Sequence, residues 1–130
     1  MPRFAVLEHT GAPDDPAGLH YDLLLEQGPR CRTWRLPTIP VPGGPDVVAI
    51  ELSPHRLAWL DHEAGDVSGG RGFARRIDAG AYALTAVADS EASRPVVVHI
   101  TLHGERFSGE LMLSKHADQW LARLAGPHTP

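Results

Sequence analysis

The chain has 130 residues, of which 42% are hydrophobic and 22% are charged, so we expect one globular domain spanning residues 1–130. Its net charge of −4 argues against a protein that wraps a long duplex, because such proteins usually have a basic surface. Its single cysteine, Cys31, excludes an internal disulfide and a cysteine-rich zinc site. The sequence has no charged-then-apolar leader and no apolar run of roughly 20 residues, so we expect a cytoplasmic protein without membrane contact.

The first part of the chain predicts three strands joined by turns and loops. With 13 glycines and 12 prolines, the sequence favours many turns and short elements over long helices. Residues 4–9, 20–27 and 31–36 have the alternating pattern of strands, and the last two are expected to form an antiparallel hairpin. The segments 10–18 and 37–45 are predicted loops, because proline and glycine interrupt both.

The rest of the chain predicts further short strands. Residues 47–52 form a strand that Ser53 and Pro54 end, with a short strand or turn following to Trp59, and residues 61–76 are expected to be a long surface loop. Further strands are predicted at 81–88, 95–102, 109–114 and, in preference to a short helix, 116–124, with a hairpin about Gly104 and a frayed tail at 126–130. The expected fold class is all-β, a small antiparallel β-barrel of about eight short strands.

The run 19–26 carries the main functional signal. Its period of two places His20 and Asp22 on one face of a strand, roughly 6–7 Å apart at Cα, so that both side chains can reach one divalent ion. His9 and His55 lie in or beside other strand-like runs, and together these residues are a candidate metal centre. A buried polar network or exposed strand side chains would produce the same pattern without a metal.

Other polar and aromatic residues have less specific interpretations. Two clusters of basic residues are either solvated loop charge or a small contact site for nucleic acid. These clusters are Arg30/Arg32/Arg35 and Arg71/Arg75/Arg76. The tryptophans are expected in the core or at its rim, and four histidines are expected at the surface. These residues are Trp34, Trp59 and Trp120, and His62, His103, His116 and His128.

A series of short motifs runs in order along nearly the whole chain. The motifs are Arg-Phe-x-x-x-x-His at 3–9, Leu-His-Tyr-Asp at 19–22, Thr-Trp-Arg-Leu-Pro at 33–37, Ser-Pro-His-Arg-Leu-Ala-Trp at 53–59, Leu-His-Gly-Glu-Arg-Phe-Ser-Gly at 102–109 and Trp-Leu at 120–121. In this order they resemble the 3′-phosphoesterase module of bacterial DNA ligase D. The Leu-His-Tyr-Asp motif is the most specific of them.

The resemblance implies a small β-barrel that binds a divalent metal, usually manganese, and trims the 3′ ends of nucleic-acid strands. Such modules remove a terminal ribonucleoside and then the 3′-phosphate that it leaves. Carried over residue by residue, His9, His20 and Asp22 are the implied metal ligands, and His55 is implied to contact the scissile phosphate. A mixed imidazole and carboxylate set suits zinc as well as manganese.

The chain departs from the family pattern where the family binds phosphate. The family's arginine two residues after the motif aspartate is Leu24 here, its lysine is Thr38 and its tyrosine is Trp59. Leucine cannot make the bidentate, charge-assisted contact of an arginine, so the metal ligands are retained while the phosphate clamp is eroded. We expect His55, Trp59 and Arg35 to contact the substrate. The cations that substitute for the missing arginine are expected among Arg35, Arg56, Arg71 and Arg75.

Two functions of different classes fit these residues. The first is a metal-dependent phosphoesterase that acts in DNA repair on nucleic-acid 3′ ends, or on a small phosphate ester. The second is a catalytically weakened or inactive module with the same barrel that binds a strand end or a DNA-repair protein. The intact ligand set and His55 favour the enzyme, while Leu24 and the acidic net charge favour the module. We favour the enzyme over this module and over a cupin-like metal barrel.

Overall fold

Nine strands and one short 3-10 helix form within residues 1–88 and 96–126, the part of the chain that the computed structural model describes. The strands are β1 (Arg3–Thr10), β2 (Leu19–Gln27), β3 (Arg30–Leu36), β4 (Val47–Arg56), β5 (Ala64–Asp66), β6 (Phe73–Ala88), β7 (Val96–Gly104), β8 (Ser108–His116) and β9 (Gln119–Leu124). The helix η1 (Leu57–Asp61) follows β4 directly.

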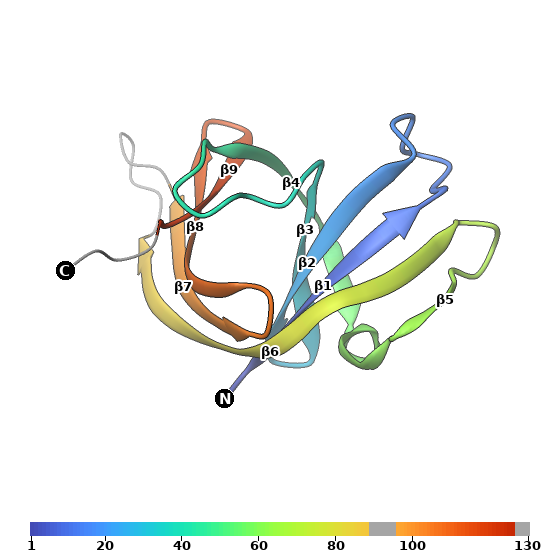
Figure 1. Cartoon of the computed structure of the whole chain (residues 1–130), viewed down its shortest axis with the longest axis horizontal. Helices are drawn as coiled ribbons and strands as arrows, with labels where there is room; N and C mark the ends of the chain where they lie inside the picture. Colours follow the sequence, from blue (N-terminus) through green and yellow to red (C-terminus); the bar gives the residue numbers. More distant parts are fainter. Residues whose placement is uncertain (89–95, 127–130) are drawn as a thin grey trace.

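Eight of these strands close an antiparallel barrel (Figure 1). They are hydrogen-bonded in the order β1-β2-β3-β4-β9-β8-β7-β6, and β6 pairs with β1 to complete the circuit. Strand β6 has 16 residues because its first part pairs with β1 and its second part pairs with β7. Strand β5 pairs with the beginning of β6 outside the closure. The predicted all-β, antiparallel barrel is therefore confirmed.

The barrel interior is an apolar core built from one face of each strand. Phe4 of β1, Leu23 and Leu25 of β2 and Trp34 of β3 are buried there, with apolar residues of the opposite wall. Trp34 packs edge-on against Trp120 of β9, with 5.4 Å between the ring centroids. The two tryptophans thus have the core position expected for them.

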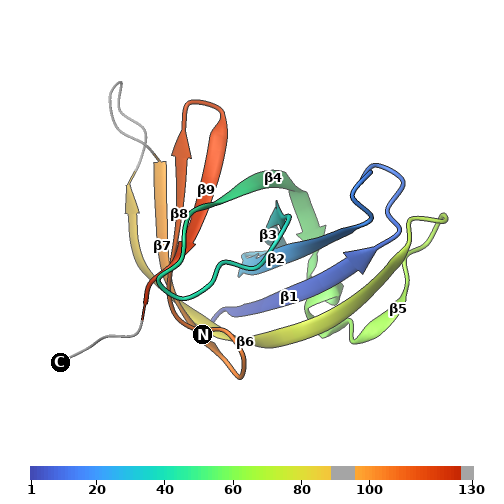
Figure 2. The same ribbon diagram turned by 45° about the horizontal axis from the view of Figure 1, so that its top comes forward.

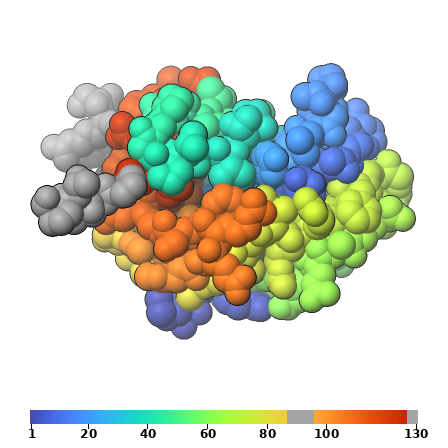
Figure 3. All heavy atoms as spheres, in the orientation of Figure 1, coloured from blue at the N-terminus to red at the C-terminus, as the bar shows by residue number. Residues whose placement is uncertain are grey.

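The predicted loop at 37–45 lies over one end of the barrel. Ile39 packs against the interior core, and the Gly43 N–H donates to the carbonyl oxygen of Leu124 at 3.0 Å. This segment (teal) lies on the face of the molecule that is in front in Figure 3.

A second apolar cluster covers the outer face of the same wall. It contains Leu7, Leu24, Cys31 and Leu60, all less than 5% exposed, and it lies beneath η1. Strands β1, β2 and β6 run side by side here, with β5 along β6 (Figure 2). Because β2 is buried on both faces, the apolar run at 23–25 interrupts its alternation. On the same outer face of β2, the residues before Leu24 are polar: they are His20 and Asp22. The candidate site lies at these residues.

Two sequence-based boundaries are wrong in the middle of the chain. Strand β4 continues through Ser53 and Pro54, where the sequence predicts its end. Its pairing with β9 stops at Ala49, so beyond that residue β4 is a sheet edge, where a proline without an N–H is tolerated. Of the short strand or turn expected next, the structure has the turn, in the form of the helix η1. The predicted loop 61–76 contains β5 and the start of β6, because pairing with distant β1 extends β6 toward its N-terminus.

The C-terminal half agrees better with the sequence patterns. The hairpin about Gly104 joins β7 and β8, and residues 119–124 form a strand, as preferred over a helix. The first residue of the predicted strand 95–102, His128 and most of the predicted frayed tail lie outside the described residues. The described part of the chain has no helix with the length and apolar character that crossing a membrane requires.

Candidate metal centre and groove

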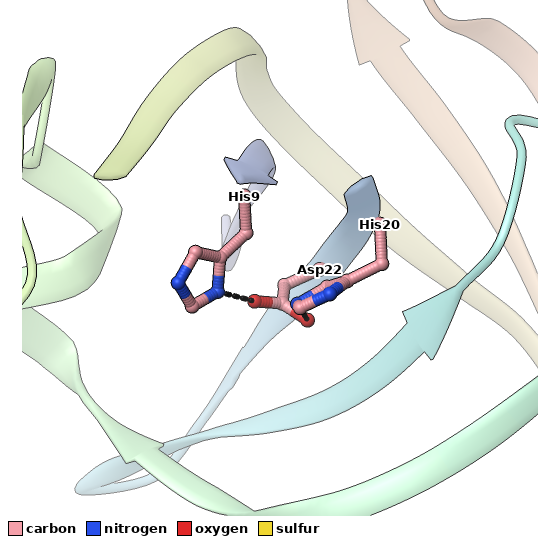
Figure 4. A group of neighbouring side chains, drawn as sticks. All are labelled: His9, His20 and Asp22. Carbon is pink, nitrogen blue, oxygen red and sulfur yellow. Dashed lines mark ion pairs between the residues drawn. The ribbon is translucent and has the colours of Figure 1, made fainter. Parts of the chain in front are cut away.

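Strand pairing brings three predicted ligands together on the outer face of the barrel. His9 of β1 lies directly opposite His20 of β2, and Asp22 follows His20 by two residues on the same face. The ligand atoms of the three side chains all lie within 4.8 Å of one another. The side chains point toward a common centre (Figure 4). All three are buried or partly buried.

Hydrogen bonds on the far side of each imidazole determine which nitrogen faces this centre. His9 Nε2 donates to the carbonyl oxygen of Arg71 at 2.7 Å. His20 Nδ1 donates to the carboxylate of Asp15 at 2.8 Å. Because a carbonyl and a carboxylate oxygen only accept, His9 Nδ1 and His20 Nε2 carry the lone pairs of the neutral rings. Both lone pairs are directed at Asp22.

His9 Nδ1, His20 Nε2 and the Asp22 carboxylate face one another, and all three are hydrogen-bond acceptors. His9 Nδ1 lies 3.7 Å from Asp22 Oδ2, and His20 Nε2 lies 3.5 Å from Asp22 Oδ1. Four buried side-chain atoms of the described residues have no hydrogen-bond partner: the acceptors His20 Nε2 and Asp22 Oδ1 in this cluster, and the donors Trp34 Nε1 and Arg35 Nε. Buried polar atoms are normally paired, so this arrangement fits a cation at the centre. The donor set of two imidazoles and one carboxylate is of the kind that binds manganese, zinc or another first-row divalent metal.

Electrostatic interactions within the cluster favour a positive charge between its side chains. Burial by itself lowers the pKa of His20, but its interactions with Asp22 and Asp15 outweigh this and raise the pKa above its ordinary value. The hydrogen bond from His20 lowers the pKa of Asp15. The cluster therefore attracts a positive charge, whether this is a proton or a metal ion.

Asp15 is a residue of the site that the sequence-based analysis missed. It lies in the loop between β1 and β2, and its carboxylate orients the imidazole of His20. Metal-binding histidines usually donate their second N–H to such an acceptor, so an aspartate in a loop between two ligand-bearing strands is a usable signal. His9 is oriented in the same way by a backbone oxygen. That contact depends on Gly72, where a Cβ would overlap the Thr10 carbonyl oxygen.

A groove of about 790 Å³ extends from the cluster over the outer face of β3 and β4. His9 and Asp22 line it, as do the predicted substrate-contacting residues His55, Trp59 and Arg35. The three substrate-contacting residues therefore share one cavity with two of the three predicted metal ligands, although none of them belongs to the three-residue cluster. That they contact a substrate, and that the cluster binds a metal, remain predictions.

The position of His55 suits interaction with an oxyanion. Its Nδ1 donates to the carbonyl oxygen of Ser53 at 3.0 Å, so Nε2 carries the lone pair of the neutral ring. The neighbouring wall residue Trp59 is half-buried and packs on His62, with 4.8 Å between ring centroids. His62, predicted at the surface, is also half-buried and bonds to the Ala74 carbonyl oxygen at 3.0 Å.

Arginines supply the positive charge of the groove, and Leu24 is not part of its lining. Three of the four predicted substitutes, Arg35, Arg56 and Arg71, line the groove. Arg30, a member of the predicted basic cluster Arg30/Arg32/Arg35, lines it as well. The fourth, Arg75, is not among the groove residues and forms an ion pair with Glu8 at 3.2 Å.

Leu24 follows Asp22 by two residues on the same face of β2 but does not reach the groove. Leu24 is 0% exposed in the apolar cluster beneath η1, where an unpaired guanidinium would be costly to bury.

The fold and the groove define a class of protein: an antiparallel β-barrel with a candidate metal centre and an arginine-lined groove on the outer face of its wall. The chain belongs to the DNA ligase D 3′-phosphoesterase domain family, whose sequence model matches residues 11–115. The predicted resemblance is thus confirmed, and the family is associated with metal. The match includes His20, Asp22 and His55 but begins after His9, so the place of His9 in the cluster rests on the structure. A comparison with curated proteins finds no match.

Proposed function

We propose that this protein is a metal-dependent phosphoesterase that removes a 3′-phosphate or a terminal ribonucleoside from nucleic-acid 3′ ends in DNA repair. Membership of the DNA ligase D 3′-phosphoesterase domain family supports this substrate class. The observation that carries the proposal is the convergence of two histidine lone pairs and one carboxylate at a buried centre without a donor.

In this proposal, His9 Nδ1, His20 Nε2 and a carboxylate oxygen of Asp22 hold the divalent metal, with manganese expected and zinc the alternative. A divalent ion bound there supplies Lewis-acid polarisation of a phosphoryl oxygen and lowers the pKa of a bound water. Asp15 keeps the lone pair of His20 directed inward, and the Arg71 carbonyl does the same for His9.

The residues of the groove bind and orient the phosphate. Arg35, opposite Asp22 in the pairing of β2 with β3, places a guanidinium beside the cluster. Its N–H groups can bind a phosphate oxygen in a bidentate manner. His55 presents Nε2, which in the protonated ring donates to a phosphate oxygen and in the neutral ring accepts a proton.

A second candidate function is recognition of a strand end without efficient cleavage. The replacement of the family's clamp arginine by the buried Leu24 favours it, because leucine offers no charged contact to a phosphate. This candidate uses the same groove and the same 3′ ends, and an assay of turnover separates it from the enzyme.

The test is hydrolysis of a 3′-phosphate primer–template by the purified protein with manganese. We expect inorganic phosphate release that is lost in the variant His20→Ala and retained in His103→Ala, a matched change at an exposed histidine outside the groove. A thermal melt of each variant separates loss of chemistry from loss of fold. Tight binding of the strand end without turnover in the wild type would support the second candidate, and neither binding nor turnover would refute both.

A further inference from the structure

Two arginines at the end of the groove lie opposite each other on neighbouring strands. Arg30 of β3 and Arg56 of β4 are register partners, and both line the groove. Like charges directly opposite in a sheet repel each other, so such a pair destabilises the strands that carry it. An anion bound between the two guanidinium groups would offset this repulsion.

Neither guanidinium has such a partner within the protein. Across residues 1–88 and 96–126, Arg30 and Arg56 have no side-chain hydrogen bond, ion pair or aromatic contact, and both side chains are exposed. Every other arginine in these ranges has at least one such interaction. The other two groove arginines are engaged in this way: Arg35 bonds to Asp14 at 3.3 Å, and Arg71 bonds to the Ser68 carbonyl at 2.6 Å.

The groove is locally positive although the chain has a net charge of −4. Its lining contains four arginines and two aspartates, Asp14 and Asp22. A metal ion in the cluster would add further positive charge at one end. A surface of this kind attracts polyanions and does so in a salt-dependent way.

The distance between the two ends of the groove indicates the size of the anion. Arg30 lies five residues along β3 from Arg35, the residue opposite Asp22. At about 3.3 Å per residue, this separation is roughly 16 Å. One strand of a duplex carries a phosphate about every 3.4 Å of helix axis, so the two ends of the groove correspond to different phosphates of one strand.

We propose that Arg30 and Arg56 form a binding site for an internal backbone phosphate of the nucleic-acid strand whose 3′ end lies at the metal cluster. The inference rests on the proposed function and names its substrate class: the groove takes an oligonucleotide in preference to a small phosphate ester. Arg30 and Arg56 thus add positive charge at the outer end of the groove, beyond Arg35, which lies beside the cluster.

The experiment compares two double variants with the same change of charge. Arg30→Gln/Arg56→Gln removes the proposed site, whereas Arg75→Gln/Arg123→Gln removes two ion-paired arginines outside the groove. Fluorescence anisotropy measures binding of a short single-stranded DNA with a 3′-phosphate at several salt concentrations. A nucleoside 3′-monophosphate and manganese alone are titrated by calorimetry as second and third probes.

The first double variant is expected to bind the oligonucleotide about tenfold more weakly than the second. The slope of its log Kd against log salt becomes shallower by about 0.7 for each backbone phosphate that the variant no longer neutralises. Binding of the nucleoside 3′-monophosphate and of manganese stays as in the wild type, because the metal cluster is intact.

Equal weakening in both double variants would overturn the inference, as would an equal effect on the nucleoside monophosphate or failure of the wild type to bind the oligonucleotide. Since binding is measured without turnover, its result is separate from that of the proposed function. A wild type that binds through this pair but releases no phosphate would refute the phosphoesterase and leave the phosphate site established.

Discussion

The variant Asp22→Asn should separate metal binding from folding, because it is expected to change the two in opposite directions. When both imidazoles are in the neutral form, the Asp22 carboxylate faces two lone pairs at 3.5 and 3.7 Å. An asparagine amide in this place donates a hydrogen bond to one of them. The metal-free variant should therefore be more stable than the wild type, while it loses the charged ligand.

The magnitudes follow from the burial of these atoms. One gained hydrogen bond between buried groups is worth about 1 kcal/mol, which for a chain of 130 residues corresponds to a rise in Tm of roughly 4 °C. Manganese at 100 times its Kd stabilises the wild type by about 2.7 kcal/mol, or roughly 10 °C. The variant should lack this second shift, since a neutral amide is a poor substitute for a carboxylate ligand.

The assay is thermal unfolding followed by circular dichroism, with chelator and then with manganese. Asp46→Asn is the matched control, because Asp46 lies outside the groove and pairs with Arg123 at 3.8 Å at the surface. A manganese shift in Asp22→Asn equal to that of the wild type would show that the carboxylate is not a ligand. A metal-free variant less stable than the control would show that the lone pairs do not face an unsatisfied acceptor.

Three further changes test the surroundings of the site and the core. Asp15→Asn should weaken manganese binding by about 10- to 100-fold in calorimetry, because it loosens the orientation of His20. The control variant Asp14→Asn should bind manganese like the wild type. Equal affinities of the two variants would contradict the orienting role of Asp15. Burial raises the pKa of the Cys31 thiol, so the thiolate forms only at higher pH than in a free thiol, and Cys31 should resist a thiol reagent at about pH 8 until denaturant is added. Rapid labelling of the native protein would show that the cluster beneath η1 opens. The Asp78 carboxylate accepts three backbone N–H groups from the β7–β8 turn at 2.8–3.2 Å. Asp78→Ala should therefore lower the free energy of unfolding in urea by roughly 1.5–3 kcal/mol, and Asp78→Asn by less.

The sequence alone predicted the fold class, and it placed His20 and Asp22 together in a candidate metal centre. Both follow from local patterns: a period of two gives strands, and in β2 it also places His20 and Asp22 on one face. The strand patterns added both His9 and His55, and the family resemblance implied a ligand role for His9 and a phosphate contact for His55. Pairing of β1 with β2 places His9 in the cluster, and His55 lies outside it in the groove. In the structure His9, His20 and Asp22 lie together, as a metal centre formed by these residues requires.

The sequence did not predict the true length of β4 or β6. Pro54 and the glycines of 61–76 are locally typical of turns, and only the neighbouring strands show why strand structure persists there. Pro54 lies beyond the pairing of β4 with β9, and β6 begins early because β1, far away in the chain, provides its partner. Pairing between distant segments carries no local signature in a single sequence.

Tertiary structure alone decided which cations reach the groove. Arg35 and Arg32 look alike in the sequence, yet one lines the groove and the other pairs with Glu51 at 2.6 Å. Likewise, only the packing of η1 on β2 shows that Leu24 is enclosed in an apolar cluster. Strand periodicity determines the face on which a side chain lies, but its partners come from segments that meet only when the barrel closes.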